Sequence, residues 1–164
     1  MPAGWEHRQQ STLARIAEPR NSEQVSPQFD LERFVAAQEP VYGAVVAELG
    51  AGRKRTHWMW FIFPQLRELG RSATAQRFGI SGVEEARAYL AHPVLGPRLR
   101  ECARLVTAIE DAPIEEILGW PDCLKLRSSM TLFARASGPA ADFVAVLERY
   151  YGGAEDPATA ALLG

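Results

Sequence analysis

Residues 95–109 read LGPRLRECARLVTAI, and this stretch decides the fold class. Its apolar residues recur every three or four positions, at Leu95, Leu99, Cys102, Leu105, Val106 and Ile109. This spacing is typical of a helix that buries one face, because a half-buried strand would alternate apolar and polar residues instead. The sequence therefore predicts a long amphipathic helix that starts at Pro93 or Pro97.

Helical spacing continues on both sides of this stretch. Further helices are predicted over residues 30–39, 40–50, 81–90, 113–118, 122–133 and 139–150, with Asp156-Pro157 opening a terminal turn. Asp30 and the capping-box spacing of Ser81 and Glu84 are expected to start two of these helices. The sequence thus predicts an all-α fold, a single compact domain of about seven or eight helices with short connections.

Residues 57–63, HWMWFIF, form a run of seven large residues that Pro64 ends. Such a run is either a helix buried on most sides or a buried strand, and periodicity alone does not separate the two. The helical neighbours, and the lack of a second convincing strand to pair with it, favour a helix capped by Thr56.

Composition sets the domain organisation. Residues 1–28 are rich in Gln, Ser, Arg, Glu and Pro, so we expect a disordered N-terminal tail before a single helical domain at residues 29–164. The tail lacks the apolar core of a signal peptide, and no run of some 18 apolar residues predicts a membrane segment. Cys102 and Cys123 lie outside short chelating spacings, which favours a reducing, cytoplasmic setting.

Charge is distributed unevenly along the chain. Residues 53–104 hold ten basic and four acidic side chains, a net charge of +6, although the whole chain carries −2. This middle third is suited to an anionic ligand, or its cations pair with neighbouring helices. The net negative charge of the whole chain and the lack of a recognised nucleic-acid-binding motif argue against nucleic acid as a partner.

Three strings together carry a resemblance to a known family: HWMWFIFPQ at 57–65, EEARAYLAHPVLG at 84–96 and KLRSSMTLF at 125–133. From about residue 29 to its end, the chain resembles the bacterial and fungal family called domain of unknown function 1810. The resemblance implies a mainly helical single domain and no established activity. Such proteins are sometimes labelled calpastatin-like, but calpastatin is a disordered inhibitor and this sequence is periodic and core-forming.

The first candidate site is the segment 54–60, KRTHWMW, which combines cations, an imidazole and two indoles. On a helix, His57 and Trp60 share a face, whereas Trp58 points elsewhere. An aromatic wall beside a histidine and a basic edge suits a flat anionic ligand, with His57 as a general acid or base. The alternative is that both tryptophans belong to the core and that His57 is a buried hydrogen-bonding residue.

The second candidate site is a polar cluster from Asp122 to Thr131. Asp122, Lys125 and Ser129 share a helix face, and Ser128 and Thr131 lie beside them. Asp122 is a candidate general acid or base, and Lys125 is expected to hold negative charge or to activate a serine. The alternative is a helix-capping Asp122 with an ion pair to Lys125, and no glycine-flanked nucleophile elbow surrounds the serines.

Five more side chains complete the predicted ligand-binding set: Gln65, Ser72, Tyr89, His92 and Arg98. Ser72 belongs to a short loop that is a weak candidate for anion binding. His92 stands directly before Pro93, so it is alternatively a residue at a helix entry. Neither a metal site nor a cofactor is predicted, since the histidines lack a nearby third ligand.

We thus predict a pocket for a nucleotide-like or other anionic small molecule, with His57, Asp122 and Lys125 as catalytic residues if the protein is a hydrolase-type enzyme. The alternative is a non-catalytic module that binds a protein through an aromatic surface, and a weaker alternative is a nucleic-acid binder. The sequence leaves open the reaction, the oligomeric state and whether the two clusters meet in space.

Overall fold

The structure is a computed structural model that describes residues 28–138 and 141–164. The chain divides into two units, Met1–Asp30 and Leu31–Gly164, and every helix belongs to the second unit. The predicted disordered tail, residues 1–28, lies outside the described residues except for its last position. Its disorder and its boundary stay predictions.

The all-α class is confirmed, because the described residues form ten α-helices and no strand. The number of helices is slightly above the seven or eight predicted. In chain order the elements are α1 (Glu32–Gln38), α2 (Tyr42–Gly50), α3 (Met59–Ile62), the 3₁₀ turn η2 (Arg67–Leu69), α4 (Ala73–Arg77), α5 (Val83–Ala91), α6 (Leu95–Ala108), α7 (Ile114–Leu118), α8 (Asp122–Ser137), α9 (Ala141–Tyr151) and α10 (Pro157–Leu163). Within this part of the chain, no helix has the length and apolar character needed to cross a bilayer.

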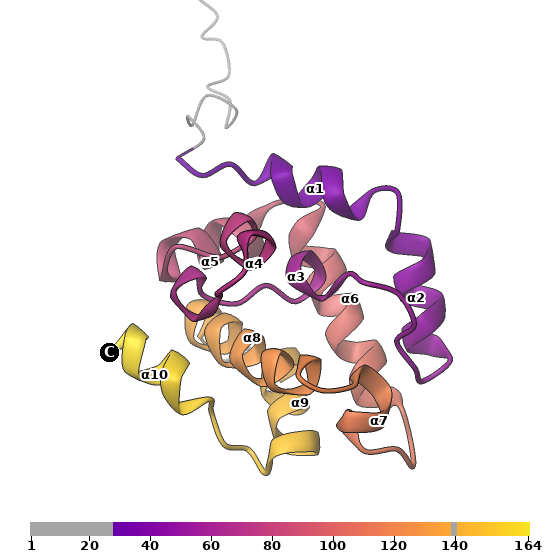
Figure 1. Cartoon of the computed structure of the whole chain (residues 1–164). Helices are drawn as coiled ribbons and strands as arrows, with labels where there is room; N and C mark the ends of the chain where they lie inside the picture. The colour runs from indigo at the N-terminus through magenta and orange to yellow at the C-terminus, as the bar shows by residue number, and fades with distance from the viewer. Residues whose placement is uncertain (1–27, 139–140) are drawn as a thin grey trace, which may run out of the picture. The chain divides into compact units, whose positions relative to one another are not determined.

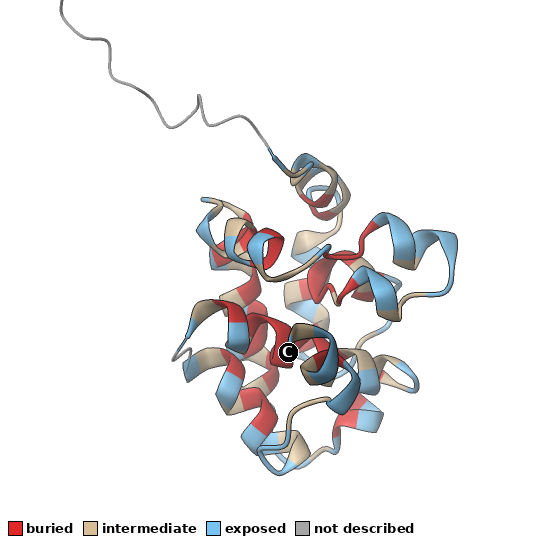
Figure 2. Ribbon diagram, turned by 90° about the vertical axis from the view of Figure 1, so that its left-hand side faces the viewer, coloured by how far each residue is buried: buried red, intermediate tan, exposed pale blue. Residues whose placement is uncertain are grey.

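Helix α8 is the centre of the second unit. It packs against α5, α7, α9 and α10, while α6 packs against α2, α5 and α9 (Figure 1). The buried residues face inward from these helices and leave their outer faces exposed (Figure 2). The long predicted helix at 95–109 is therefore confirmed as α6, and its apolar face is buried as its spacing requires.

A row of aromatic rings runs through the core. The ring centroids of Phe34 and Tyr89 are 5.0 Å apart, those of Tyr89 and Phe133 5.2 Å, and those of Phe133 and Phe143 6.0 Å. All four side chains are fully buried, and they come from α1, α5, α8 and α9. Because burial of each large apolar side chain contributes roughly 1.5–3 kcal/mol, this row ties four separate helices together.

Two of the predicted helix starts are displaced by one residue. The N-cap of α1 is Leu31 and not Asp30. The N-cap of α5 is Gly82 and not Ser81, so the third helical residue is Glu85, whose carboxylate accepts the Ser81 N–H at 2.8 Å. The predicted capping box of Ser81 and Glu84 is therefore absent, and the neighbouring Glu85 binds the N–H of the residue before the cap instead.

The aromatic run at 57–63 is helical only in its middle. Helix α3 covers Met59–Ile62 and its N-cap is Trp58, so the prediction of Thr56 as its cap is wrong. All its residues are buried except His57, which is exposed, and Trp60, which is half-buried. After Pro64, a single parallel bridge joins Leu66 to Ile80. The run thus folds as one helical turn between buried irregular segments, because tertiary packing outweighs local periodicity here.

Helices α5 and α6 approach each other most closely at Gly96. A Cβ atom at this position would lie 2.1 Å from the Leu90 carbonyl oxygen, so only glycine fits. Just before it, the Nδ1 atom of His92 accepts the N–H groups of Val94 at 3.1 Å and Leu95 at 3.3 Å. This confirms the interpretation of His92 as a helix-entry residue, because these N–H groups have no partner inside α6.

Candidate functional site

The carboxylate of Glu48 fixes the segment that follows α2. It accepts the N–H groups of Arg55 at 2.7 Å and Thr56 at 3.0 Å, the Thr56 hydroxyl at 2.7 Å and the indole N–H of Trp58 at 2.9 Å. Burial would raise the pKa of Glu48, but the hydrogen bond from Arg55 and the other three together outweigh burial and lower this pKa from 4.5 to about 2. Glu48 therefore stays ionised and holds residues 53–58 in one conformation.

Lys54 extends from this segment to the start of α8, where it meets Asp122. The Nζ atom of Lys54 is 3.0 Å from Oδ2 of Asp122, and that of Lys125 is 3.7 Å from Oδ1. The side chain of Lys54 is 8% exposed and that of Lys125 is 27% exposed. One carboxylate thus serves two ammonium groups, and the closer, more buried partner is Lys54. The excess positive charge of this Lys54/Asp122/Lys125 cluster lies at Lys125.

Each of the two lysines also lies over an indole ring. The Lys54 Nζ is 5.3 Å from the ring centroid of Trp58, and the Lys125 Nζ is 5.6 Å from that of Trp60. A cation over an indole face is attracted by the ring's electron density. The two polar clusters of the sequence therefore meet in space, because Lys54 of the first cluster and Lys125 of the second both contact Asp122.

A groove of about 290 Å³, called the α8 groove below, lies beside Lys125. Its lining combines the first half of α8 with the segment after α3 and the start of α10, in residues Gln65, Leu69, Pro121, Leu124, Lys125, Arg127, Ser128, Asp156 and Ala158. Gln65 and Lys125 also line a narrow slot of about 10 Å³ among Trp60, Phe63 and Phe78, which has room for about one water molecule. An aromatic wall, an amide and an ammonium group therefore converge from separate segments.

Two large apolar side chains at the start of α8 are exposed. Trp120 directly precedes the groove residue Pro121 and is 74% exposed, and the groove residue Leu124 is 49% exposed. Single exposed apolar residues are common on protein surfaces. An indole exposed to this extent beside a groove is informative, because it presents a flat ring for stacking.

Three of the predicted ligand-binding side chains belong to structural networks. Trp58 is fully buried. Tyr89 is buried as well, its hydroxyl accepts a hydrogen bond from Nε2 of Gln38 at 3.0 Å, and burial raises its pKa. Arg98 donates to Glu39 at 2.9 Å and to the Gln38 amide oxygen at 3.3 Å. These contacts join α1, α5 and α6, and the structure does not bring these three residues into the α8 groove.

Hydroxyl groups of the second cluster hold α10 on α8. The Ser128 hydroxyl lies 3.1 Å from Oδ2 of Asp156, the residue that caps α10 by accepting the Thr159 N–H at 3.0 Å. The Thr131 hydroxyl accepts the Asp156 N–H at 2.9 Å and donates to the Arg127 carbonyl at 2.8 Å. Ser128 and Thr131 are thus occupied by tertiary hydrogen bonds, which the sequence pattern did not indicate.

The remaining predicted residues lie outside the groove. Ser72 is exposed, and its hydroxyl caps α4 by accepting the Ala75 N–H at 3.1 Å. Ser129 is fully buried, and its hydroxyl has no hydrogen-bond partner in the part of the chain that the structure describes. His57 is exposed and lines neither the groove nor the slot. Of the three predicted catalytic residues, Asp122 and Lys125 are brought together, and His57 is not brought to the groove.

Sequence reasoning counted Lys54 among the cations of the first candidate site without giving it a role, and it overlooked Arg127. One compositional signal was available for Lys54, because the chain has 18 basic residues and 16 of them are arginine. The two lysines are Lys54 and Lys125, and both meet at the same carboxylate. Arg127 gave no such signal, because its place in the groove depends on how α8 and α10 pack.

Comparisons with known proteins agree with the fold. A family model described as "Protein of unknown function (DUF1810)" matches residues 28–163. The chain is 65% identical to the conserved hypothetical protein Rv1873 from Mycobacterium tuberculosis, whose crystal structure matches with a TM-score of 0.81 over 82% of this chain and 96% of that one. A search of curated proteins gave no match.

Proposed function

The chain belongs to the DUF1810 family, and for this member we propose that the α8 groove binds an anionic small molecule of nucleotide-like chemistry. The observation that carries this proposal is the shared carboxylate of Asp122. Because the Asp122 carboxylate lies closer to Lys54 than to Lys125, it compensates the charge of Lys125 less. The ammonium group of Lys125 therefore presents positive charge beside the groove. A phosphate or carboxylate of the ligand is its natural additional partner.

The groove offers further groups of suitable chemistry. Gln65 provides an amide that both donates and accepts hydrogen bonds, and it lines the groove together with Lys125. Arg127 donates from Nε to the Ala154 carbonyl at 3.1 Å, which leaves the other nitrogens of its guanidinium available. The exposed ring of Trp120 supplies a stacking face for a planar base. These groups support a ligand that is anionic at one end and flat at the other.

Lysine usage supports a specific role for the ammonium groups. Arginine occupies 16 of the 18 basic positions of this chain. The two lysines nevertheless lie at the same carboxylate, which departs from the general use of arginine. An ammonium is a compact charge on a flexible stem, whereas a guanidinium is a wide planar fork. The space between Asp122 and two indole rings suits the compact group.

We propose binding at this groove without covalent catalysis. The hydroxyl of Ser128 is close to Asp156, which also accepts hydrogen bonds from Thr159, so that carboxylate is already engaged as a helix cap. Asp122 is held in ion pairs with two lysines. A nucleophile needs a free base beside it, and these contacts favour a binding role for the site.

A thermal-shift screen against nucleotides, NAD-related compounds and sugar phosphates tests the proposal. A ligand at one hundred times its dissociation constant stabilises the folded protein by about 2.7 kcal/mol. We expect the shift to fall in Lys125→Met, which keeps the apolar stem, and in Gln65→Leu. Arg104→Gln serves as the matched control, because Arg104 is an exposed cation on α6 that does not line the groove.

An equal shift in wild type, Lys125→Met and Arg104→Gln would exclude Lys125 as the anion contact. The absence of a shift with every compound in the panel would count against the proposed function as a whole. Lys125 is partly exposed, so its replacement is expected to leave the fold intact, and a circular dichroism spectrum checks this.

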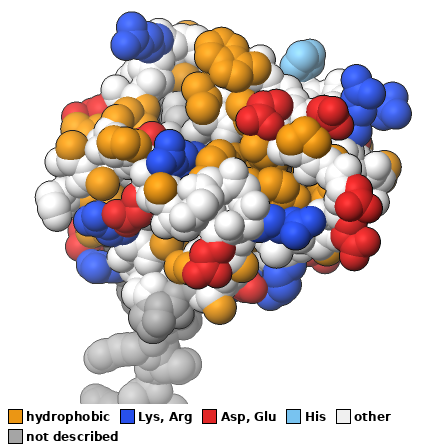
Figure 3. Space-filling model, turned by 90° about the horizontal axis from the view of Figure 1, so that it is seen from below, with side chains coloured by type: hydrophobic (Ala, Val, Ile, Leu, Met, Phe, Trp, Pro, Cys, Tyr) orange, Lys and Arg blue, Asp and Glu red, His pale blue; other side chains and the backbone are white. Residues whose placement is uncertain are grey.

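A protein-interaction module is the second candidate function, and the exposed pair Trp120 and Leu124 favours it. Tryptophan is enriched among the residues that dominate interface energies. On the face shown in Figure 3, positive and negative side chains are interspersed with hydrophobic ones. Such a mixed surface suits a protein better than a polyanion such as nucleic acid. A self-association that Trp120→Ser abolishes in analytical ultracentrifugation would favour this second function.

We also propose a reducing, cytoplasmic setting for the protein. Cys102 and Cys123 are both buried and both free. Buried free thiols are ordinary in reducing compartments, whereas secreted domains tend to pair theirs. This proposal is independent of the ligand.

A further inference from the structure

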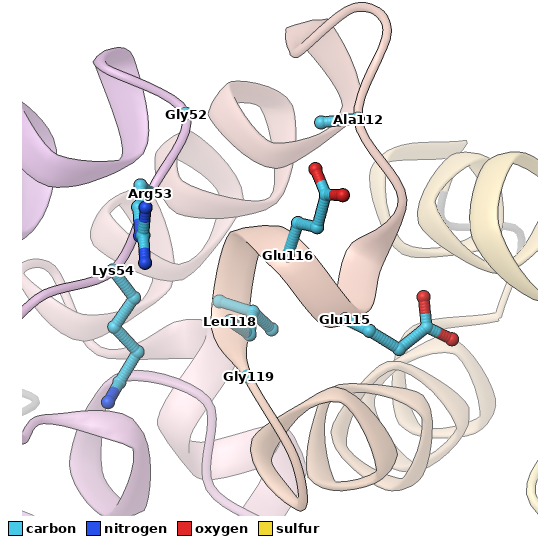
Figure 4. Close-up of a pocket in the computed structure, with 8 residues that line it drawn as sticks. All are labelled: Gly52, Arg53, Lys54, Ala112, Glu115, Glu116, Leu118 and Gly119. Carbon is cyan, nitrogen blue, oxygen red and sulfur yellow. The ribbon is translucent and has the colours of Figure 1, made fainter.

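A second cleft, called the α7 cleft below, lies on the other side of Lys54. Its volume is about 500 Å³, and its lining consists of Gly52, Arg53, Lys54, Ala112, Glu115, Glu116, Leu118 and Gly119 (Figure 4). Small-molecule sites have volumes of about 300–1,000 Å³, so this cleft has the capacity for a metabolite. None of its lining residues except Lys54 takes part in the site described above.

The walls of the α7 cleft are held in place by backbone hydrogen bonds. The Lys54 N–H donates to the Ile117 carbonyl at 2.7 Å, which ties the segment after α2 to helix α7. Gly52 and Gly119 have φ angles of +80° and +83°, in the left-handed region that favours glycine. The Glu48 carboxylate fixes the chain just beyond Lys54. The cleft is therefore preformed, which lowers the entropic cost of binding.

Charges of opposite sign line this cleft without pairing. The ammonium group of Lys54 points away toward Asp122, its partner at 3.0 Å (Figure 4). Arg53 lies on one side of the cleft and the carboxylate of Glu116 on the other, and neither forms an ion pair with any residue that the structure describes. The side chain of Leu118 is 6% exposed and lies lower than both in the view of Figure 4. A guanidinium and a carboxylate thus lie on opposite sides of the cleft.

We propose that the α7 cleft binds a small zwitterion of the α-amino acid class. The ligand's carboxylate pairs with the guanidinium of Arg53, and its ammonium group pairs with the carboxylate of Glu116. Its side chain contacts the half-buried Ala112 and the small exposed part of Leu118. Glu115 and Glu116 would repel a purely anionic ligand, and Arg53 would repel a purely cationic one, so both kinds of ligand are disfavoured.

Isothermal titration calorimetry of the full chain against each standard L-amino acid tests this inference. We expect at least one amino acid to bind saturably. Its decarboxylated amine and its deaminated acid should each bind about tenfold more weakly or worse, because each loses one charge-assisted pair. The substitutions Arg53→Gln and Glu116→Gln should each weaken binding of the intact amino acid to a similar extent.

Glu110→Gln is the matched control, because Glu110 is exposed between α6 and α7 and does not line the cleft. It should bind like the wild type. Lys125→Met should also leave amino-acid binding within about twofold, which separates this inference from the α8 groove. The inference is overturned if no amino acid binds, if the single-charge analogues bind equally well, or if Arg53→Gln and Glu116→Gln match the wild type. Chemical-shift changes on binding should fall in residues 52–54 and 112–119.

Discussion

Glu48 shows how one side chain positions a segment that carries no regular structure. Its carboxylate accepts four hydrogen bonds from residues 55–58, so the chain just after Lys54 is held at a defined place. A loop of this composition would otherwise sample many conformations. The position of the Lys54 ammonium therefore depends on a residue that touches no ligand in either proposed site.

Replacement of Glu48 by glutamine tests this role through pH. The folded state lowers the pKa of Glu48 from 4.5 to about 2, so its stabilisation is fully present above pH 4.5 and is lost as the pH falls toward 2. We expect Glu48→Gln to lower the free energy of unfolding at neutral pH by about 1 kcal/mol, a value discounted for screening by water. The difference from wild type should shrink below pH 4.5 in urea titrations.

Glu148→Gln is the control for this measurement, because Glu148 is exposed on α9 and lies far along the chain from the segment that Glu48 holds. Its unfolding curves should follow the wild type at every pH. A Glu48→Gln protein whose loss of stability persisted unchanged at pH 2 would contradict the assigned ionisation.

Residue types in the sequence indicated candidates but not their partners. His92 was interpreted either as a ligand contact or as a helix-entry residue, and only the structure shows its Nδ1 atom on two N–H groups of α6. Tyr89 and Arg98 were predicted as ligand contacts because they surround a junction between two predicted helices. Gln38, which satisfies both, lies more than fifty residues away in sequence. Hydrogen-bond partners at such separations follow from packing and not from spacing.

At the scale of elements, periodicity predicted the long helices well and the short ones poorly. Helices α6 and α9 have one buried face, which leaves a clear repeat in the sequence, whereas α8 is buried on every side from Ser128 to Phe133. Helices α3 and α4 have four and five residues, too few for a repeat to show. Their positions depend on burial against neighbours, which has no local signature.

Thr131→Val tests how α10 is attached. Valine keeps the shape of the side chain but leaves the Asp156 N–H without its acceptor at 2.9 Å. We expect a loss of about 1 kcal/mol, concentrated in α10, because a partly buried donor without a partner carries part of its desolvation cost. Hydrogen exchange should accelerate in residues 156–163 and change little in α5.

Thr107→Val is the matched control. The Thr107 hydroxyl donates to the Ala103 carbonyl at 2.9 Å, four residues earlier in α6, much as Thr131 donates to Arg127 at 2.8 Å. It makes no bond to another helix among the residues that the structure describes. Equal exchange in α10 for both variants would show that the Thr131 hydroxyl does not hold this helix.

At the scale of the whole second unit, Gly96 marks a close contact between α5 and α6. Gly96→Ala would place a methyl group 2.1 Å from the Leu90 carbonyl oxygen, so the two helices must separate. We expect a loss of about 3 kcal/mol in the free energy of unfolding, measured by urea denaturation.

Gly43→Ala is the opposite case, because its added Cβ meets nothing within 4 Å in α2. Removing a helical glycine there should stabilise the protein by about 0.5–1 kcal/mol.

The arrangement of the candidate site was predictable only in part. Asp122 and Lys125 are three residues apart on one helix, so their proximity followed from sequence. Lys54 lies far from Asp122 in the sequence. Its ammonium group reaches Asp122 only because the segment after α2 lies against α7 and α8. The middle third was identified as basic, but charge counts alone did not say which of its cations would meet α8.

Asp122 also has a consequence for how the two proposed sites communicate. Lys54 lines the α7 cleft and Lys125 lines the α8 groove, and a single carboxylate balances both. An anion that draws Lys125 away leaves Asp122 to Lys54 alone, which changes the field that an amino acid meets in the α7 cleft. Thermodynamic reciprocity then requires the amino acid to change the affinity for the anion by the same factor. Because Lys125→Met is expected to change amino-acid binding by no more than about twofold, the coupling through Asp122 should be small, and each ligand would change the affinity for the other by that same small factor.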